Sequence, residues 1–332
     1  MIRNMPIFNK LSTLIANKLT VDDLQIEVEY LIKDFLVKNA LYIFFAKAGQ
    51  GKSWLMLSLA IKLLQENLIR QCVYLDMDNS KAALKNRRVD ELIEKYPDLA
   101  YIHSSKIDVS SKNILESLSI EAKQNENCFE GVLFIFDSIR DFLGGSDMNS
   151  DRDILPIMAQ LKDLREAGAT VIFLHHTTKD SDGHQFKGST SFIDSVDVAY
   201  SLASNRNENI LSYQLMVHKD RLSVENTALD LDTQTMILTS ENFEFSSMSD
   251  NEVNFVKSVQ EFLQSVGADG VKQTDLLKAI GKSSDDKTAR KYLKNFSGEM
   301  WKSQQVAKDN NAIYYFAIDL PNTPNLPDQM VA

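Results

Sequence analysis

Cysteine is scarce in this 332-residue sequence, and long apolar runs are absent. The two cysteines, Cys72 and Cys128, lie far apart inside strand-like stretches, which argues against a disulfide framework or a cysteine-based zinc site and favours a reducing, cytoplasmic setting. No stretch approaches the roughly 18 apolar residues that a membrane-crossing helix requires. Arg3, Lys10 and Lys18 are not followed by an uninterrupted apolar stretch and a cleavage site, so we expect no signal peptide.

An excess of positive charge is also missing. The chain has 36 Lys and Arg against 46 Asp and Glu, which gives a formal net charge of −10. This balance argues against binding of nucleic acid through overall charge, although a local basic surface would still attract phosphates. The apolar share of 44% and the charged share of 25% are ordinary for a soluble globular protein. The length suits one large domain with a small one, or two of moderate size.

What the sequence does contain is a regular alternation of strand-like and helical patterns. Short stretches rich in apolar, aromatic and branched residues predict strands at residues 40–46, 70–78, 100–105, 131–137 and 169–176. Two of them, residues 40–46 and 131–137, are expected to be buried on both faces. Helical patterns fill most of the intervals, and four more strand-like stretches with short connections follow. We therefore predict an α/β fold with a mainly parallel sheet, covered by helices and extended at one edge.

Four further segments flank this predicted core of residues 37–240. Residues 1–36 are predicted to form an N-terminal helical segment, because apolar residues recur at helical spacings from residue 8 onward. The polar, serine-rich residues 241–251 suit a linker. Three short helices and a hairpin in residues 252–318 match a winged-helix domain. The proline-containing tail, residues 319–332, is predicted to be disordered.

A phosphate-binding loop is indicated between the strand-like residues 40–46 and the helix that follows. Gly49 and Gly51 allow backbone N–H groups to converge on phosphate oxygens, and the helix N-terminus adds partial positive charge. Lys52 would reach the β- and γ-phosphates of ATP, and Ser53 would bind Mg²⁺. A chance Gly-Lys-Ser turn is the alternative, but the flanking strand and helix argue against it. The predicted nucleotide contacts are Ala48, Gly49, Gln50, Gly51, Lys52, Ser53 and Trp54.

Polar residues end three other predicted strands. Asp137 follows five apolar residues, so its carboxylate is expected beside the phosphate-binding loop, where a Mg²⁺-linked acid belongs; a turn-forming Asp is the alternative. Asp76 and Asp78 end another strand, and each is a candidate general base or helix cap. His175 and His176 end the third. Because adjacent strand residues point to opposite faces, we expect one histidine to sense the γ-phosphate rather than both to share a metal.

Six segments, in this order, resemble those of RecA-type ATPases, in particular the RepA-like group of hexameric helicases. They are AGQGKS, YLDMDN, FDSIRDFLGG, FLHHTTK, GSTSFIDSVD and VHKDR. The similarity covers roughly residues 28–235, and the combination is far more selective than a phosphate-binding loop alone. The resemblance implies a RecA-like P-loop core and a homo-oligomeric ring, expected to be a hexamer, with ATP and Mg²⁺ held between subunits.

The resemblance also implies a role for each matching position. Ser53 and Asp137 would be the Mg²⁺ ligands, and Asp78 takes the place usually held by a catalytic Glu. Lys219 and Arg221 resemble the pair that reaches the ATP of a neighbouring subunit, where the planar, permanently charged Arg suits the transition state; a solvated turn is the alternative. The implied catalytic set is Lys52, Asp78, Asp137, Arg221 and, as the γ-phosphate sensor, His176.

Two positions depart from the family pattern. Ala46 stands where the pattern G-x-x-x-x-G-K-[ST] asks for glycine, and a methyl group fits there if the backbone keeps a negative φ. Asp78 is shorter than the usual Glu by about one methylene, which places its carboxylate farther from the attacking water. We therefore expect slower ATP hydrolysis rather than none.

Contacts to DNA are expected from two regions. By the resemblance, the loops after the strands that end at Asp137 and His176 face a central channel for single-stranded DNA; their cations are Arg140, Lys179 and Lys187. Mobile surface loops are the alternative. In the predicted winged helix, cations at i, i+3, i+4 and i+7 share one helical face, which suits duplex DNA: Lys287, Arg290, Lys291 and Lys294. Residues 252–317 hold ten Lys or Arg and eight Asp or Glu, and a protein-interaction unit is the alternative.

Two functions follow from these expectations. The first is an ATP-driven, ring-forming DNA helicase or translocase of the RepA-like type; the chain lacks a primase-like or zinc-ribbon segment, so unwinding or loading is favoured over priming. The second is an ATP-gated regulator or adaptor that binds DNA or a partner without processive unwinding. The departures at Ala46 and Asp78 favour the second, and the set of Lys52, Asp137 and Arg221 favours the first.

Overall fold

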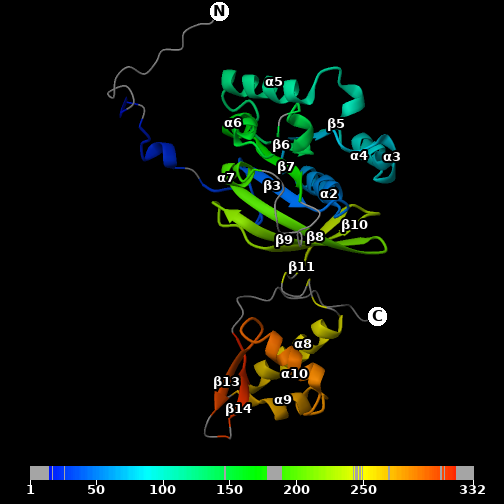
Figure 1. Ribbon diagram of the computed structural model, residues 1–332, viewed down its shortest axis with the longest axis vertical. Helices are drawn as coiled ribbons and strands as arrows, with labels where there is room; N and C mark the ends of the chain where they lie inside the picture. Colours follow the sequence, from blue (N-terminus) through cyan, green and yellow to red (C-terminus); the bar gives the residue numbers. More distant parts are fainter. Residues whose placement is uncertain are drawn as a thin grey trace, which may run out of the picture. The chain divides into compact units, whose positions relative to one another are not determined.

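The computed structural model describes residues 15–16, 18–25, 27–145, 147–177, 189–241, 243, 246, 248, 250–267, 270–306, 309 and 311–318. The chain divides into two compact units, Met1–Phe243 and Glu244–Ala332 (Figure 1). Each unit has a hydrophobic core of its own. Within the residues just given, no helix is both long and apolar enough to cross a lipid bilayer.

Nine strands of the described part of the first unit form one sheet. They are β3 (Leu41–Ala46), β4 (Gln71–Asp76), β5 (Leu99–His103), β6 (Val132–Asp137), β7 (Thr170–His176), β8 (Val198–Asn207), β9 (Ile210–Asp220), β10 (Thr227–Asp232) and β11 (Ile237–Glu241). The sheet order is β11-β10-β9-β8-β3-β7-β6-β4-β5. The strands from β8 to β5 run parallel, and β9, β10 and β11 continue the sheet in antiparallel pairing. The predicted α/β fold with a mainly parallel sheet extended at one edge is confirmed.

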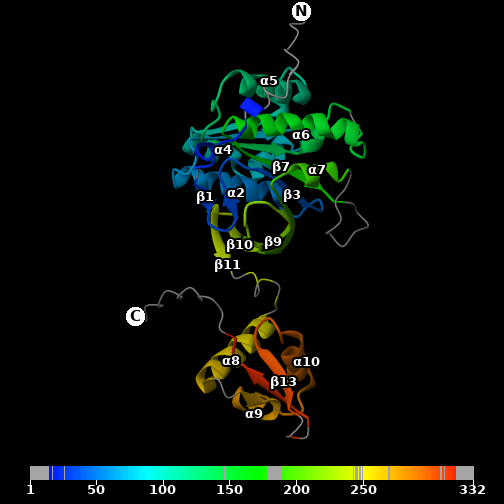
Figure 2. The same cartoon turned by 90° about the vertical axis from the view of Figure 1, so that its left-hand side faces the viewer.

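Helices cover both faces of this sheet. They are α2 (Lys52–Gln65), α3 (Lys81–Asn86), α4 (Val89–Lys95), α5 (Ser111–Gln124), α6 (Asp151–Glu166), α7 (Ser191–Ser195) and the 3-10 helices η2 (Ser104–Lys106) and η3 (Ile139–Phe142). Alternate residues of the buried strand β3 supply two cores. Tyr42 and Phe44 pack on the side of α2, whereas Ile43 and Phe45 pack on the side of α5 and α6, which lie side by side (Figures 1 and 2). The carboxyl end of β3 is therefore fixed between two apolar layers.

The N-terminal segment differs from the predicted helices of residues 1–36. Its described part is helical at residues 15–16, and it then contains η1 (Asp22–Leu24) and a hairpin of β1 (Tyr30–Ile32) and β2 (Leu36–Val37). The chain turns at Asp34, whose φ of 58° is incompatible with a continuing helix. Phe35 is buried beside Tyr200, with ring centroids 5.3 Å apart, and the Tyr200 hydroxyl donates to the Phe35 carbonyl. Burial against the core decides the conformation here, so the helical prediction is wrong for the hairpin.

The second unit combines three helices with a small sheet. Its elements are α8 (Asp250–Val266), β12 (Val271–Lys272), α9 (Gln273–Ala279), α10 (Lys287–Asn295), β13 (Lys302–Val306) and β14 (Ala312–Phe316). The strands pair antiparallel in the order β12-β14-β13. Trp301 is fully buried, and its indole N–H donates to the Leu293 carbonyl at 2.9 Å. Trp301 and Tyr315 are therefore core residues, while the predicted tail, residues 319–332, lies outside the described part.

Candidate nucleotide site

The loop between β3 and α2 turns at two glycines. Gly49 has φ 83° and Gly51 has φ 71°, the left-handed region that L side chains avoid. Gly51 immediately precedes α2, so the helix opens directly from the loop. A Cβ atom added to Gly51 would lie 2.8 Å from the Tyr213 hydroxyl oxygen, whereas one added to Gly49 would meet open space. Conformation and space both require glycine at position 51.

Strands β8 and β9 brace this loop from the side. The Ser204 amide donates to Gln50 Oε1 at 2.6 Å, and the Ser204 hydroxyl donates to the Gln50 carbonyl at 3.0 Å. The Tyr213 hydroxyl donates to the Gly51 carbonyl at 3.0 Å. Because carbonyl oxygens on this side are occupied by β8 and β9, the backbone of the loop is held in place before any ligand arrives.

The other predicted nucleotide contacts differ in exposure. Ala48 and Gly49 are exposed at the tip of the loop, and Ser53 is half-buried in the first turn of α2. The Trp54 side chain packs against the core on the α2 side. Its ring therefore serves packing, and its backbone N–H is the part that the helix N-terminus offers to an anion.

Ala46, which stands where glycine is expected, is accommodated without strain. It is the last residue of β3, is fully buried and pairs with His176 of β7. It is not among the residues with positive φ. Its carbonyl accepts hydrogen bonds from the Lys52 ammonium at 3.0 Å and from the Thr177 amide at 3.2 Å. The Ala46 methyl group is therefore compatible with the backbone path from β3 into the loop.

Lys52 is almost completely buried at the start of α2. Its Nζ donates to the carbonyls of Ala46, at 3.0 Å, and Lys47, at 3.2 Å, and lies 3.3 Å from His176 Nδ1. Burial lowers the pKa of Lys52 to about 8, and the nearby Asp137 and Asp78 oppose this shift. Among the described residues, this buried ammonium touches carbonyls and an imidazole but no carboxylate. It is therefore poorly compensated and fits an anionic ligand such as a phosphate.

Asp137 ends β6 and is only 3% exposed. Burial raises its pKa to about 6, and a hydrogen bond from Ser53 opposes the rise. The Tyr74 hydroxyl donates to Asp137 Oδ2 at 2.9 Å, and the Asn79 amide lies 3.3 Å from the same oxygen. A hydroxyl and a carboxylate in contact form the oxygen donor set that Mg²⁺ prefers. Ser53 and Asp137 therefore fit the predicted Mg²⁺ site.

The two aspartates that follow β4 have different surroundings. Asp76 is fully buried, and its Oδ1 accepts from the backbone amides of Asp78, at 3.2 Å, and Asn79, at 3.0 Å. Asp76 therefore closes the loop after β4 and is not a candidate base. The Asp78 carboxylate is half-exposed and lies 3.7 Å from His176 Nε2, on the side where Lys52 lies. Of the two, Asp78 is the one that water and ligand can reach.

His175 and His176 point to opposite faces of β7, as predicted. The His175 ring is buried and lies against Phe192, with ring centroids 4.9 Å apart. The His176 ring lies between Lys52 and Asp78. Burial and the neighbouring Lys52 lower the pKa of His176. A neutral imidazole is therefore favoured beside the buried ammonium.

Arg221 lies at the edge of the sheet opposite to the phosphate-binding loop, and Lys219 lies two residues before it on β9. Lys219 pairs with Ala199 at the amino end of β8, and β8 runs parallel to β3. The loop, in contrast, follows the carboxyl end of β3. The Lys219 ammonium donates to the carbonyls of Ile193, at 2.8 Å, and Asp194, at 2.6 Å, at the end of α7. Lys219 therefore lies level with Ile43, near the middle of β3. Arg221 follows Asp220, which lies level with Tyr42, so most of the length of β3 separates Arg221 from Lys52 of its own chain.

The Arg221 guanidinium is about half exposed, with a side-chain exposure of 53%. Its Nη1 lies 3.9 Å from Asp197 Oδ1. Asp197 is already engaged, because it accepts from Arg165 Nη1 at 2.8 and 2.9 Å and from the Leu41 amide at 2.9 Å. Arg221 is therefore held loosely and remains open to solvent.

The residues predicted to contact DNA lie in separate places. Arg140 is exposed on η3, close enough to His176 to contribute to its lowered pKa. Lys179 and Lys187 lie outside the described residues. The remaining four are exposed on α10, whose Ala289 and Leu293 face the core: Lys287, Arg290, Lys291 and Lys294. Arg290 also donates to the Ser284 carbonyl at 2.8 Å, next to the start of α10.

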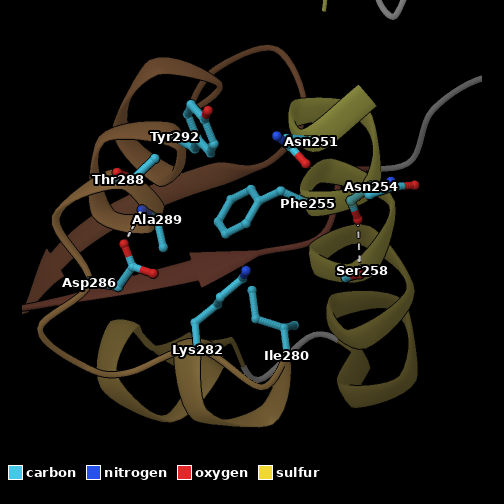
Figure 3. A pocket seen from close by; sticks show the side chains of 10 residues that line it. All are labelled: Asn251, Asn254, Phe255, Ser258, Ile280, Lys282, Asp286, Thr288, Ala289 and Tyr292. Atoms are coloured by element: carbon cyan, nitrogen blue, oxygen red, sulfur yellow. Dashed lines mark hydrogen bonds between the residues drawn. The ribbon is translucent and has the colours of Figure 1, made fainter. Parts of the chain in front are cut away.

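A groove of about 490 Å³ lies beside α10 in the second unit (Figure 3). Phe255 of α8 points into it, and Thr288 and Tyr292 of α10 line it. Since these two α10 residues are four apart, they share one stripe of the helix. The surface of α10 is thus divided into a groove side and a separate basic side.

Tyr74, Asn79, Arg87 and Tyr101 also belong to the site, although sequence reasoning passed over them. The Tyr101 hydroxyl donates to Asp76, and Arg87 Nη2 donates to Asn79 Oδ1 at 3.0 Å. One signal was available for Tyr74, which stands two residues before Asp76 on a strand and so shares its face. However, a tyrosine in an apolar strand is usually interpreted as a core residue. The contacts of Asn79 and Arg87 form only when the loop after β4 is folded, so no sequence pattern indicates them.

A family model described as an AAA domain matches residues 10–182, slightly more than half of the chain. The chain belongs to this AAA domain family. This family supports the predicted P-loop ATPase. Among solved structures, the chain is similar to a KaiC-like protein from the hyperthermophilic archaeon Pyrococcus horikoshii OT3, with 13% identity and a TM-score of 0.42 over 62% of this chain and 91% of that one. No curated protein matches the chain.

Replacing Gly51 with Ala is expected to weaken ATP binding at least about tenfold. The new methyl group meets the Tyr213 hydroxyl, and the positive φ alone costs an L residue about 1–2 kcal/mol. A fluorescence titration with a labelled ATP analogue measures the loss. Gly49→Ala, the matched control, carries the φ cost without the clash and should lose less. Adding Tyr213→Phe should restore part of the binding of Gly51→Ala; equal losses in both glycine variants and no restoration would contradict the contact.

Nucleotide binding is expected to take up protons near pH 8. The Lys52 pKa of about 8 leaves roughly half of the ammonium unprotonated at that pH, and a bound phosphate raises the pKa and draws a proton in. Calorimetric titration in buffers of different ionisation enthalpy should give an uptake of about 0.5 proton at pH 8. Asp137, with a pKa of about 6, is already ionised at that pH and contributes almost no release. Lys52→Arg, which keeps the charge but does not titrate, should abolish the uptake. A wild-type binding enthalpy that is independent of buffer at pH 8 would refute this expectation.

Proposed function

We propose that this P-loop ATPase is a ring-forming DNA helicase or translocase of the RepA-like type, in which a neighbouring subunit completes each ATP site. The position of Arg221 carries the proposal. Strand β3 has six residues, which at about 3.3 Å each extend roughly 20 Å. An Arg side chain cannot cover that distance across the sheet, so Arg221 would have no ATP to act on unless a second copy supplied one.

The residues around Lys52 suit hydrolysis of a phosphoanhydride. Lys52 would hold the β- and γ-phosphates, and Ser53 with Asp137 would hold Mg²⁺, which supplies neutralisation of charge on the phosphates. Asp78 is the accessible carboxylate that would accept the proton of the attacking water. His176, which bridges Asp78 and Lys52, would respond to the γ-phosphate. Arg221 from the neighbouring subunit would stabilise the charge that develops during transfer.

The second unit supports an association with DNA. We propose that it is a winged helix, since the order of its elements, α8-β12-α9-α10-β13-β14, places a helix pair before a β-hairpin. The nine residues of α10 include no Asp or Glu, and its exposed side carries Lys287, Lys291 and Lys294. That side suits the phosphates of a duplex, whereas single-stranded DNA would pass the loops near Arg140.

An ATP-gated, DNA-binding regulator or adaptor is the second candidate. The basic side of α10 favours it, because this surface belongs to a unit of its own and requires no ring channel to bind DNA. The shorter carboxylate at Asp78 also suits slow turnover. The two candidates differ in one property: only a helicase or translocase couples turnover to movement along single-stranded DNA.

Mixing two inactive variants tests the shared site. Arg221→Ala keeps an intact P-loop and should hydrolyse ATP about 10³-fold more slowly than wild type. Lys52→Ala lacks the phosphate-binding ammonium but keeps Arg221. In an equimolar mixture, we expect steady-state hydrolysis well above the sum of the two separate rates, because Lys52→Ala subunits supply Arg221 to intact P-loops.

Hydrolysis equal to the mean of the two variants would reject a contribution from the neighbouring subunit. A matched control is Arg206→Ala, which removes an exposed Arg from the end of β8 and should leave turnover unchanged. Addition of single-stranded DNA then separates the two candidates. Stimulated turnover with strand separation supports the helicase, and unchanged turnover without strand separation supports the regulator.

Removing two charges from α10 is expected to weaken duplex binding in a salt-dependent way. The full-length Lys291→Gln, Lys294→Gln variant should lower the slope of log K against log salt by about 1.8, since each phosphate contact contributes roughly 0.9. Fluorescence anisotropy with a labelled duplex measures the slope. Lys257→Gln, Lys278→Gln makes the same charge change at exposed positions of α8 and α9 and should leave the slope nearly unchanged. Equal effects of both pairs would show that net charge, rather than α10, governs binding.

A further inference from the structure

Two buried carboxylates lie side by side at the carboxyl edge of the sheet. Strands β4 and β6 pair in parallel with Asp76 opposite Asp137. Asp76 is fully buried and Asp137 is 3% exposed. Two like charges in a place with little water repel one another, and the repulsion must be offset by donors from the protein.

Asn79 supplies the donor that joins the two. Its Nδ2 lies 3.0 and 3.1 Å from the two oxygens of Asp76 and 3.3 Å from Asp137 Oδ2. The orientation of the amide is determined by its other end, because Arg87 Nη2 donates to Asn79 Oδ1 at 3.0 Å. A flipped amide would turn its oxygen toward two carboxylates and its NH₂ group toward a guanidinium. The network therefore allows only one orientation of Asn79.

The same hydrogen-bond network occupies one of the two carboxylate oxygens of Asp137. The Tyr74 hydroxyl donates to Oδ2 at 2.9 Å, and Asn79 approaches the same atom. The Tyr74 ring is held in turn by stacking on Tyr101, with centroids 4.7 Å apart and planes 13° apart. With Oδ2 turned toward β4 and its loop, the other carboxylate oxygen is left for the ligand side of the site.

We propose that Asn79 is a positioning residue for Mg²⁺ binding. It joins Asp76 to Asp137, fixes the plane of the Asp137 carboxylate and so presents one oxygen to the metal beside Ser53. Asn79 also follows Asp78 directly, so the same contact ties the loop that carries Asp78 to the end of β6. This inference rests on the proposed nucleotide site and concerns how that site holds its metal, not whether a nucleotide binds.

The test compares nucleotide affinity with and without the metal. A fluorescent ADP analogue is titrated into the full-length protein in excess EDTA and in excess Mg²⁺. For Asn79→Ala, we expect unchanged affinity in EDTA and a loss of about 10- to 100-fold in the gain that Mg²⁺ gives the wild type, the range found for residues that orient metal ligands. Asn149→Ala is the matched control, since Asn149 donates to Asp147 at 3.1 Å in the loop after β6 and has no bond to Asp137.

Tyr74→Phe provides an independent variant if Asn79→Ala does not fold. It keeps the ring stacked on Tyr101 and removes one donor to the same oxygen, so it should show the same selective loss. Equal losses in EDTA and in Mg²⁺, or no loss in either, would overturn the inference. If the wild type binds the analogue equally in EDTA and in Mg²⁺, the inference is overturned while the nucleotide site stands. If the wild type binds the analogue in neither condition, the proposed nucleotide site fails, which is a separate result.

Discussion

The first unit depends on holding Lys52 and Asp137 as charges near each other in a place that water scarcely reaches. A buried charge costs free energy on the order of several kcal/mol when no polar group of the protein compensates it. The apolar strands β3 and β6 provide the dry surroundings, and the braced loop and the polar network after β4 provide the compensation. Each of these features is needed because the charges are buried.

Much of this arrangement is predictable from the residues. A strand that is apolar at every position is buried on both faces, so β3 and β6 could be placed in the middle of a parallel sheet, and Asp137 at its carboxyl edge. The phosphate-binding motif around Lys52 places a loop and then a helix directly after β3. Adjacent strand residues diverge, which allowed His175 and His176 to be assigned to opposite faces. Each of these inferences depends only on residues that lie within a few positions of one another, so the sequence alone contains the information.

The contacts that escaped prediction join residues far apart in the chain. Apolar residues at mixed spacings before residue 36 suggested helices, but Phe35 is buried against Tyr200, 165 positions away, and the chain forms a hairpin there. Tyr74 and Asn79 likewise owe their roles to Asp137 on another strand. No local sequence pattern indicates such contacts, because they form only when the sheet brings distant residues together. The bracing of the loop by Ser204 and Tyr213 is of the same kind.

The placement of the two tryptophans has a practical consequence for spectroscopy. The sequence contains only Trp54 and Trp301, and each unit holds one of them. Trp54 adjoins Ser53 in the first turn of α2 and is half-buried, whereas Trp301 is sealed in the core of the second unit. Intrinsic fluorescence therefore carries two separable signals. One follows the surroundings of the phosphate-binding loop, and the other follows the integrity of the second unit, without any added label.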